Sequence, residues 1–221
     1  MEDMQKLEGI AKENINLARH EKELAKTSLE SSKLEVKRAK ARELLAKNEL
    51  ILAETRKDLA NKRKMLLEKK RAIKKEKIID FSEDELKKEN DYVLYFEKVA
   101  KAQIDIAEIS KKIVEMERKI ANQRKVLANL RLNTANTRET LVKKLESYVR
   151  TLKLKLPEEK ISKSKNEYIK IQKDVETIKK DFVELENLIK RNENKLANLN
   201  NELSLKLSER EKIRHLNIEI E

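Results

Sequence analysis

The stretch that decides the fold runs from Ile161 to Leu203 and reads ISKSKNEYIKIQKDVETIKKDFVELENLIKRNENKLANLNNEL. Apolar residues return in it every seven positions, and a second set, apolar except for one asparagine, follows three positions after the first. The two sets are Ile161, Tyr168, Val175, Phe182, Ile189, Leu196 and Leu203, and Ile171, Ile178, Leu185, Asn192 and Leu199. A heptad pattern kept over about six repeats is typical of a coiled-coil seam. This segment therefore predicts a long helix that pairs with another helix.

The preceding segment, residues 83–155, has the same periodicity. Its two columns are Tyr92, Val99, Ile106, Ile113, Ile120, Leu127, Leu141 and Tyr148, and Tyr95, Ala102, Ile109, Met116 and Leu130. Polar residues interrupt these columns at Gln123, Thr134 and Thr137. Such residues, like Asn192, either fix register and partner choice at a cost in stability or mark a frayed part of the seam. The sequence leaves both interpretations open.

The first segment, residues 1–77, carries a wider apolar face. Leucines recur every seven residues in a column that alanines accompany one position later: Leu45, Leu52, Leu59, Leu66 and Ile73, beside Ala39, Ala46, Ala53 and Ala60. Neighbouring positions lie about 100° apart around a helix, so the two columns together suit contact with more than one neighbour. The helices that pack against this face can come from this chain, from a second copy or from another protein.

Two breaks separate the three segments. In the first break, residues 78–82, Ser82 and Glu85 form the spacing of a capping box at the start of a new helix. In the second, residues 156–157, Pro157 cannot continue a helix but suits the start of one. The sequence thus predicts an all-α, elongated coiled coil of about three long helices, with a frayed C-terminus in the helix of 158–221, arranged as a hairpin or as a hinged rod.

A charge comparison favours a hairpin at the first break. Residues 56–77 hold 11 Lys or Arg against 3 Asp or Glu, whereas residues 83–104 hold 4 against 6. Folding back would place these segments of opposite charge beside each other. Exposed ion pairs contribute only about 0 to 1 kcal/mol each, so they set orientation more than stability.

Composition excludes several classes of protein. The chain of 221 residues has one Gly, one Pro and no Cys, while 43% of its residues are charged. A compact domain needs more turn residues than this, and neither disulfides nor cysteine-ligated zinc can form. His20 and His215 have too few neighbouring ligands for a metal site, and Gly9 alone makes no phosphate-binding loop. We therefore expect no enzyme, no cofactor and no metal, in an intracellular, cytoplasmic or cytoskeletal protein.

Candidate functional residues fall into two groups. The candidate partner interface comprises apolar residues of the heptad columns: Leu45, Leu52, Leu59, Leu66, Val99, Ile106, Ile113, Ile120, Val175, Ile178, Phe182, Leu185, Ile189, Leu196 and Leu199. The candidate anionic-surface site is a basic run: Arg56, Lys57, Lys62, Arg63, Lys64, Lys69, Lys70, Arg71, Lys74, Lys75 and Lys77. Such a run attracts microtubules, phospholipid headgroups or nucleic acid, and it equally suits a solvated helix face.

A short motif lies at the first break. Ile79, Asp80 and Phe81 are followed by Leu86-Lys87-Lys88-Glu89-Asn90 within a long coiled coil that has a proline break further on. This pattern resembles a coiled-coil domain shared by paired axonemal proteins near the base of ciliary radial spokes. The resemblance implies an elongated structural component of the cilium that assembles with another coiled-coil chain and has no enzymatic activity.

Three functional hypotheses follow from these patterns. The first is a structural coiled-coil subunit that acts as scaffold, spacer or adaptor in a cytoskeletal or other multi-subunit assembly, paired with another coiled-coil chain as a homo- or hetero-oligomer. The second is a membrane-binding helical dimer of the BAR type, which needs its Lys and Arg on one concave face and at the tips. The third is a chromosome-associated coiled coil that binds DNA through residues 56–77.

Overall fold

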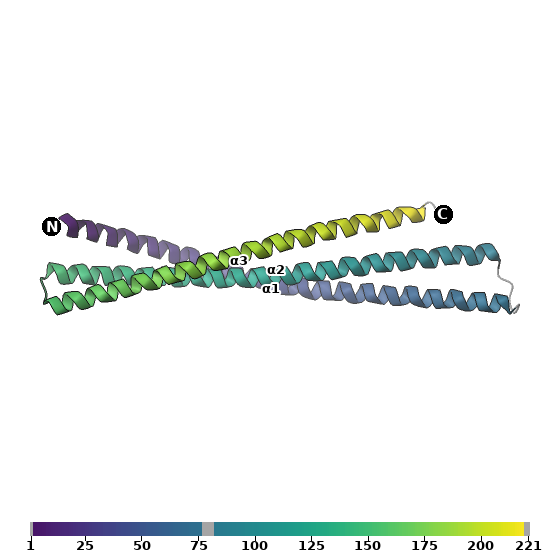
Figure 1. The fold of residues 1–221 in the computed structure, drawn as a ribbon, viewed down its shortest axis with the longest axis horizontal. Coiled ribbons are helices and arrows are strands. Elements are labelled where there is room, and N and C mark those ends of the chain that lie inside the picture. The colour runs from purple at the N-terminus through teal and green to yellow at the C-terminus, as the bar shows by residue number, and fades with distance from the viewer. Residues whose placement is uncertain (1, 77–81, 219–221) are drawn as a thin grey trace. The chain divides into compact units, whose positions relative to one another are not determined.

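The fold is made of three long helices, in agreement with the all-α class that the sequence predicts. The computed structural model describes residues 2–76 and 82–218, with side-chain surroundings for Gly9, 13–76 and 82–215. The helices are α1 (Glu2–Lys75), α2 (Glu83–Lys153) and α3 (Glu158–Ile218), as labelled in Figure 1. The described residues contain no strand. Residues 77–81 of the first predicted break, and the last residues of the predicted frayed end, lie outside the described part.

The start of α2 has the capping box that the sequence predicts. The backbone N–H of Glu85 donates to Oγ of Ser82 over 3.1 Å, and the backbone N–H of Ser82 donates to Oε2 of Glu85 over 3.2 Å. Acidic residues fill the first turn, where they interact favourably with the positive end of the helix dipole. The capping box therefore satisfies two of the backbone N–H groups at this helix end that lack an intrahelical partner.

The end of α2 is closed by a residue in a conformation that usually requires glycine. Lys155 has φ 46°, in the left-handed region. Its N–H donates to the carbonyl of Leu152 over 3.1 Å, and the N–H of Leu156 donates to the carbonyl of Thr151 over 3.2 Å. This pair of hydrogen bonds is a Schellman motif. The carbonyl of Pro157 then accepts the first hydrogen bonds of α3, so the proline begins a helix as predicted.

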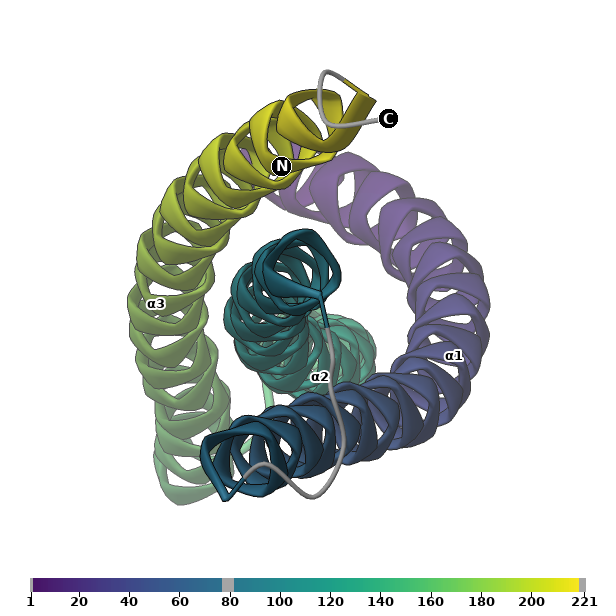
Figure 2. The ribbon, with the colours of Figure 1, turned by 90° about the vertical axis from the view of Figure 1, so that its right-hand side faces the viewer.

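The chain divides into two compact units, and each unit contains parts of all three helices. Unit 1 comprises Met1–Arg38 and Lys119–Glu193, and unit 2 comprises Ala39–Arg118 and Asn194–Glu221. Figure 2 shows the same three helices end-on.

Helices α1 and α2 run antiparallel in unit 2. Lys70 contacts Glu89, 19 residues away in sequence, and Arg42 contacts Glu117, 75 residues away. Sequence separation that grows with distance from the connection is the signature of an antiparallel pair. Lys64 pairs with Glu97 over 3.0 Å between these two points. The hairpin alternative therefore holds at the first break, and the opposite charges of the two segments meet.

The same antiparallel arrangement is found in unit 1 for both helix pairs. Between α1 and α2, the sequence separation of contacting residues rises from 89 at Glu35 and Arg124 to 117 at Lys22 and Glu139. Between α2 and α3, Lys144 contacts Glu167, 23 residues away. Arg124 also contacts Glu193, 69 residues away. Arg124 thus joins α2 to both neighbouring helices.

Mainly small residues, with Leu67 at one end of the column, form the buried contact between α1 and α2. Every seventh residue of α1 is at most 5% exposed from Ala18 to Leu67, and the matching column of α2 is equally buried except at Val114, which is half-buried. The members are Ala18, Ala25 and Ser32 with Ala121, Ala128, Ala135, Val142 and Val149 in unit 1, and Ala39, Ala46, Ala53, Ala60 and Leu67 with Val93, Ala100 and Ala107 in unit 2. Because alanine has only a methyl group, such a column lets two helices approach closely.

The ion pairs set the register of these alanine columns. In unit 2, Ala53 lies midway between Arg42 and Lys64, and Ala107 lies midway between their partners Glu117 and Glu97. Ala53 therefore lies opposite Ala107. In unit 1 the core also reaches α3, since Ile15 and Tyr168 pack against the buried cluster of Val142, Leu145 and Val149.

Candidate interaction surface

The most prominent uncovered feature of unit 2 is an apolar stripe on α1, which we name the outer stripe. Its seven members are 52% to 62% exposed: Leu44, Leu45, Ile51, Leu52, Leu59, Met65 and Leu66. They include the four leucines that the sequence predicts as a partner interface. Large aliphatic side chains are typically buried, and a contiguous exposed row of them marks an interaction site.

Helix geometry gives the outer stripe a definite width. One column consists of Leu45, Leu52, Leu59 and Leu66, and a second, one residue earlier, contains Leu44, Ile51 and Met65. The two columns lie about 100° apart. The positions between them hold Ala41, Asn48 and Thr55, which are exposed and small. The face is therefore broad enough to seat another helix without a bulky obstacle in its N-terminal half.

Burial of the outer stripe under a partner would contribute a modest free energy per residue but a substantial total. Complete burial of a leucine side chain contributes about 1.5 to 3 kcal/mol. Since more than half of each stripe residue is exposed, a partner that covered it would gain roughly 1 kcal/mol per residue. Association costs about 4 to 15 kcal/mol in lost motional freedom. A binding partner therefore has to cover most of the outer stripe.

The other predicted interface residues lie on α2 and α3, and each of them is buried or half-buried within the chain. In unit 1, Ile120, Val175 and Ile189 are buried, while Ile178, Phe182 and Leu185 are half-buried. In unit 2, Ile113 is buried, while Val99, Ile106, Leu196 and Leu199 are half-buried. These side chains contribute to intrachain packing, whereas the predicted interface leucines of α1, Leu45, Leu52, Leu59 and Leu66, are exposed.

The polar residues of the predicted seam include one pair that meets. Asn192 is only 2% exposed, and its Nδ2 donates a hydrogen bond to Oε1 of Gln123 over 2.9 Å. Thr134 instead donates to the carbonyl of Leu130 in its own helix. The contact between Asn192 and Gln123 joins α2 to α3 in unit 1 at one position. It fixes the register there, because a shifted seam would leave both amides without partners.

The basic run divides into residues that contact α2 and residues that do not. Lys64 and Lys70 form ion pairs with Glu97 and Glu89, and Arg71 donates to Oδ1 of Asn90 over 2.9 Å. Arg63 lies over the ring of Phe96, with its Cζ 4.2 Å from the ring centroid. Within the described part of the chain, the others have no side-chain partner: Arg56, Lys57, Lys62, Lys69, Lys74 and Lys75. Lys77 lies outside the described residues.

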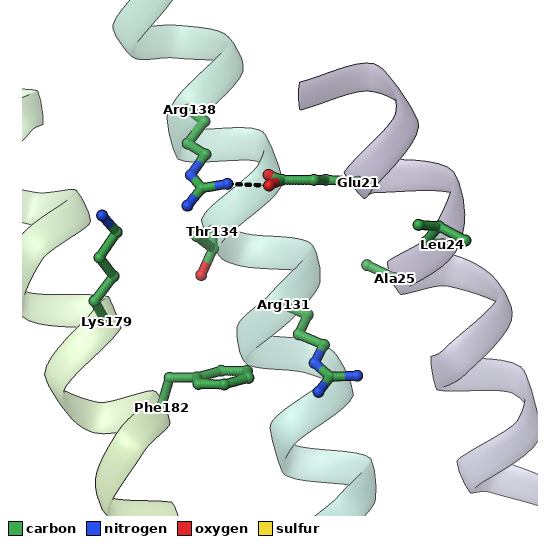
Figure 3. Close-up of a pocket in the computed structure, with 8 residues that line it drawn as sticks. All are labelled: Glu21, Leu24, Ala25, Arg131, Thr134, Arg138, Lys179 and Phe182. Atoms are coloured by element: carbon green, nitrogen blue, oxygen red, sulfur yellow. Dashed lines mark hydrogen bonds and ion pairs between the residues drawn. The ribbon is translucent and has the colours of Figure 1, made fainter. Parts of the chain in front are cut away.

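A cavity of about 360 Å³ lies among the three helices of unit 1 (Figure 3). Apolar, polar and charged side chains from all three helices line it: Leu24, Ala25 and Phe182, with Glu21, Thr134, Arg131, Arg138 and Lys179. Glu21 forms an ion pair with Arg138, and Arg131 lies over the Phe182 ring, 5.2 Å from its centroid. The only carboxylate among these lining residues is therefore engaged in an ion pair with Arg138.

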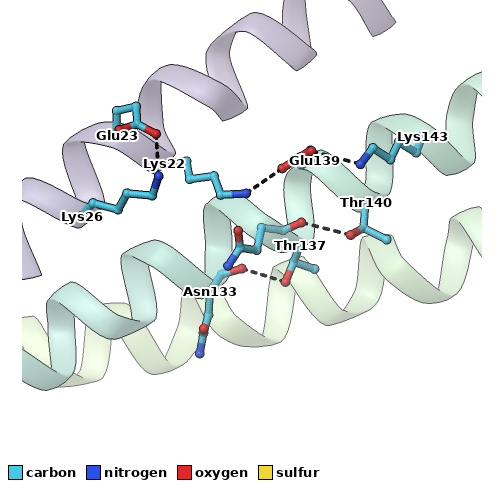
Figure 4. Close-up of polar contacts among 9 residues, drawn as sticks. Lys22, Glu23, Lys26, Asn133, Thr137, Glu139, Thr140 and Lys143 are labelled. Atoms are coloured by element: carbon cyan, nitrogen blue, oxygen red, sulfur yellow. Dashed lines mark hydrogen bonds and ion pairs between the residues drawn. The ribbon is translucent and has the colours of Figure 1, made fainter.

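Glu139 is the most strongly perturbed titratable group that the structure shows. Hydrogen bonding to Lys143, and then to Lys22, lowers the pKa of the Glu139 carboxyl to about 2. Figure 4 shows these two lysines on either side of the carboxylate. Lys22 belongs to α1 and reaches Glu139 over 3.1 Å, whereas Lys143 belongs to α2 and lies 3.0 Å away. This carboxylate therefore links α1 to α2 in unit 1.

Neither a membrane-spanning helix nor a cluster of metal ligands is found among the residues that the structure describes. Among residues 2–76 and 82–218, no helix combines the length and apolar character needed to cross a bilayer. The same residues bring together no group of three His, Cys, Asp or Glu side chains that could hold a metal ion. His20 and His215 are exposed.

Sequence reasoning missed the small-residue column of α2. Val93, Ala100 and Ala107 recur every seven residues, one position after the apolar column that the sequence analysis favours. The seven-residue spacing of this column could have indicated a buried contact, and so could the same spacing of Ala18 and Ala25 in α1.

Comparison with known proteins gives no match to this chain, whether with family models, with curated proteins or with solved structures.

Proposed function

We propose that this chain is a non-enzymatic structural coiled-coil subunit that assembles with another helical chain through the outer stripe of α1. It acts as a scaffold, spacer or adaptor in a multi-subunit assembly. The observation that carries the proposal is that α1 of unit 2 has two different apolar faces. One face of the helix packs on α2 through alanines, and another face carries seven exposed aliphatic side chains.

A helix with one face for intrachain packing and another for binding a partner suits a scaffold. The alanine columns and the ion pairs hold α1 against α2 without using the large aliphatic residues. Those residues then remain available to bind a second helix. A helix exposing such a face without a partner would instead promote nonspecific association. Binding through the outer stripe therefore supplies a function and also protects the chain from aggregation.

A cytoskeletal setting, with the cilium as one example, is the finer part of this proposal. Its support is the resemblance carried by Leu86-Lys87-Lys88-Glu89-Asn90. In the structure, Glu89 and Asn90 contact Lys70 and Arg71 of α1. These two motif residues thus contribute to the hairpin of unit 2, while Ile79, Asp80 and Phe81 lie outside the described residues.

The decisive experiment compares assemblies formed by the full chain and by the double variant Leu52→Asp, Leu59→Asp in cells of its source. We expect native-mass measurement of extracts to place the wild-type chain in a larger complex and the variant in a smaller one. Val183→Asp is the matched control, because Val183 is a similarly exposed aliphatic residue, 55% exposed, on α3. Equal complex sizes for wild type and the double variant, with both chains folded by circular dichroism, would contradict the proposal.

The choice between cytoskeletal, membrane and DNA targets is tested with the unpartnered cations of the basic run. Sedimentation with microtubules, anionic vesicles and duplex DNA at two ionic strengths separates these targets. For a cytoskeletal subunit we expect microtubule binding that weakens with salt and is lost in Lys62→Glu, Lys69→Glu. Binding to vesicles or duplex alone would favour the membrane or the DNA alternative.

A further inference from the structure

The charge around the outer stripe restricts what can cover it. Residues 40–75 of α1 hold 13 Lys or Arg against 5 Asp or Glu. Part of this surplus is neutralised within unit 2, since Arg42, Lys64 and Lys70 pair with acids of α2. The remaining positive charge lies toward the C-terminal half of the stripe.

Two of the unpartnered cations lie on the same face of α1 as the outer stripe. Lys62 and Lys69 continue the line of Asn48 and Thr55, seven residues apart, between the two aliphatic columns. Both lysines are exposed, and neither has a side-chain partner among the described residues. A helix seated on the stripe would therefore place its own side chains directly against these two ammonium groups.

A second copy of this chain fits that face poorly. Parallel pairing of two outer stripes would place each lysine near its own equivalent. Antiparallel pairing with Leu52 opposite Leu59 gains a contact between Lys62 and Glu49, but it brings Lys69 beside Arg42. In either orientation, two strongly basic segments come together, and like charges in close contact oppose association.

We propose that the outer stripe, from Leu44 to Leu66, binds an acidic amphipathic helix of a different chain. Apolar residues of that helix cover the leucines, and carboxylates concentrated toward one end pair with Lys62 and Lys69. The inference rests on the proposed function and adds the chemistry of the partner. It makes the assembly heterotypic, because charge complementarity selects the partner and opposes self-pairing.

The test measures binding of two designed helices to the full chain by fluorescence anisotropy. Each probe has about four heptads with leucine at the seam positions, and the probes differ only in flanking residues, which are Glu in one and Lys in the other. We expect the acidic probe to bind at least about tenfold more tightly than the basic probe at low salt, with the difference shrinking at physiological salt.

Variants assign the binding to the stripe and to the two lysines. Leu52→Asp, Leu59→Asp should abolish binding of the acidic probe. Lys62→Glu, Lys69→Glu should weaken it by about tenfold or more while improving binding of the basic probe. Val183→Asp should leave both affinities unchanged. Equal affinity for the two probes, or no effect of the lysine variant, would overturn the inference.

Sedimentation equilibrium of the chain alone separates this inference from the proposed function. A stable dimer that dissociates in the Leu52→Asp, Leu59→Asp variant would overturn the acidic partner and leave the stripe as an assembly surface. In contrast, source-cell complexes that are insensitive to the same variant would overturn the proposed function itself.

Discussion

Replacing Ala53 by leucine should destabilise the contact between α1 and α2 in unit 2. Ala53 is 4% exposed and lies opposite Ala107, which is 5% exposed. The register at this point is held by Arg42 with Glu117 on one side and by Lys64 with Glu97 on the other. A leucine adds three carbon atoms to a contact that is closed by methyl groups, so it must push the helices apart or adopt a strained rotamer.

Overpacking of this kind costs about 1 to 3 kcal/mol. The matched control is Leu52→Ala at the adjacent position, where the side chain is 52% exposed. Half-burial of a leucine contributes roughly 1 kcal/mol, and alanine is the stronger helix former. The control should therefore lose less stability than Ala53→Leu, although a conventional hydrophobicity scale predicts the opposite order.

Urea unfolding followed by circular dichroism gives the overall stability of both variants. Hydrogen exchange of the amides around residue 53 reports local opening of α1 and does not require two-state unfolding. We expect faster exchange in Ala53→Leu than in Leu52→Ala. If Ala53→Leu were as stable as wild type or more stable, the two helices would not be closely packed through alanines, and the reasoning would be refuted.

Three further predictions concern single contacts. Lys155→Gly should stabilise the chain by up to about 1 kcal/mol, because glycine adopts the left-handed conformation without strain; unchanged or lower stability in urea would contradict that conformation. Asn192→Ala should cost about 1 to 3 kcal/mol by leaving the Gln123 amide without its partner, and a neutral result would mean that water already satisfies this part of the seam. The pKa of Glu139 is lowered in the folded chain, so its contribution to stability is present above about pH 4.5 and is lost as the pH falls toward about 2. Glu139→Gln should therefore melt below wild type at pH 6 and approach it near pH 2, whereas a constant difference across this range would refute the assignment.

Much of the architecture could be predicted from the sequence, because the relevant signals are local. The heptads of residues 161–203 predict a paired helix, and the spacing of Ser82 and Glu85 predicts the cap that both residues form. The charge contrast across the first break correctly favours a hairpin. These features depend on side chains within one or two turns, or on the net charge of a segment, and need no knowledge of distant contacts.

Which face of α1 packs against α2, and which face stays exposed, could not be predicted in the same way. A hydrophobicity pattern ranks Leu52 above Ala53 as a core residue, yet Ala53 is buried and Leu52 is exposed. The reason is that close helix approach favours small side chains, and the partner column of Ala100 and Ala107 becomes relevant only when the register is known. The pairing of Asn192 with Gln123 likewise depends on register, although each residue is recognisable as a polar seam position.

The assignment of the two α1 faces can be tested most directly by thiol labelling. The chain has no cysteine, so Leu52→Cys and Ala53→Cys each introduce a single thiol at adjacent positions on different faces. Reaction with a neutral reagent, with each rate divided by the rate in urea, reports exposure of that face. We predict that the thiol at position 52 reacts almost as fast as in the unfolded chain and that the thiol at position 53 reacts at least about a hundredfold more slowly. Equal protection at the two positions, or stronger protection at position 52, would contradict the account.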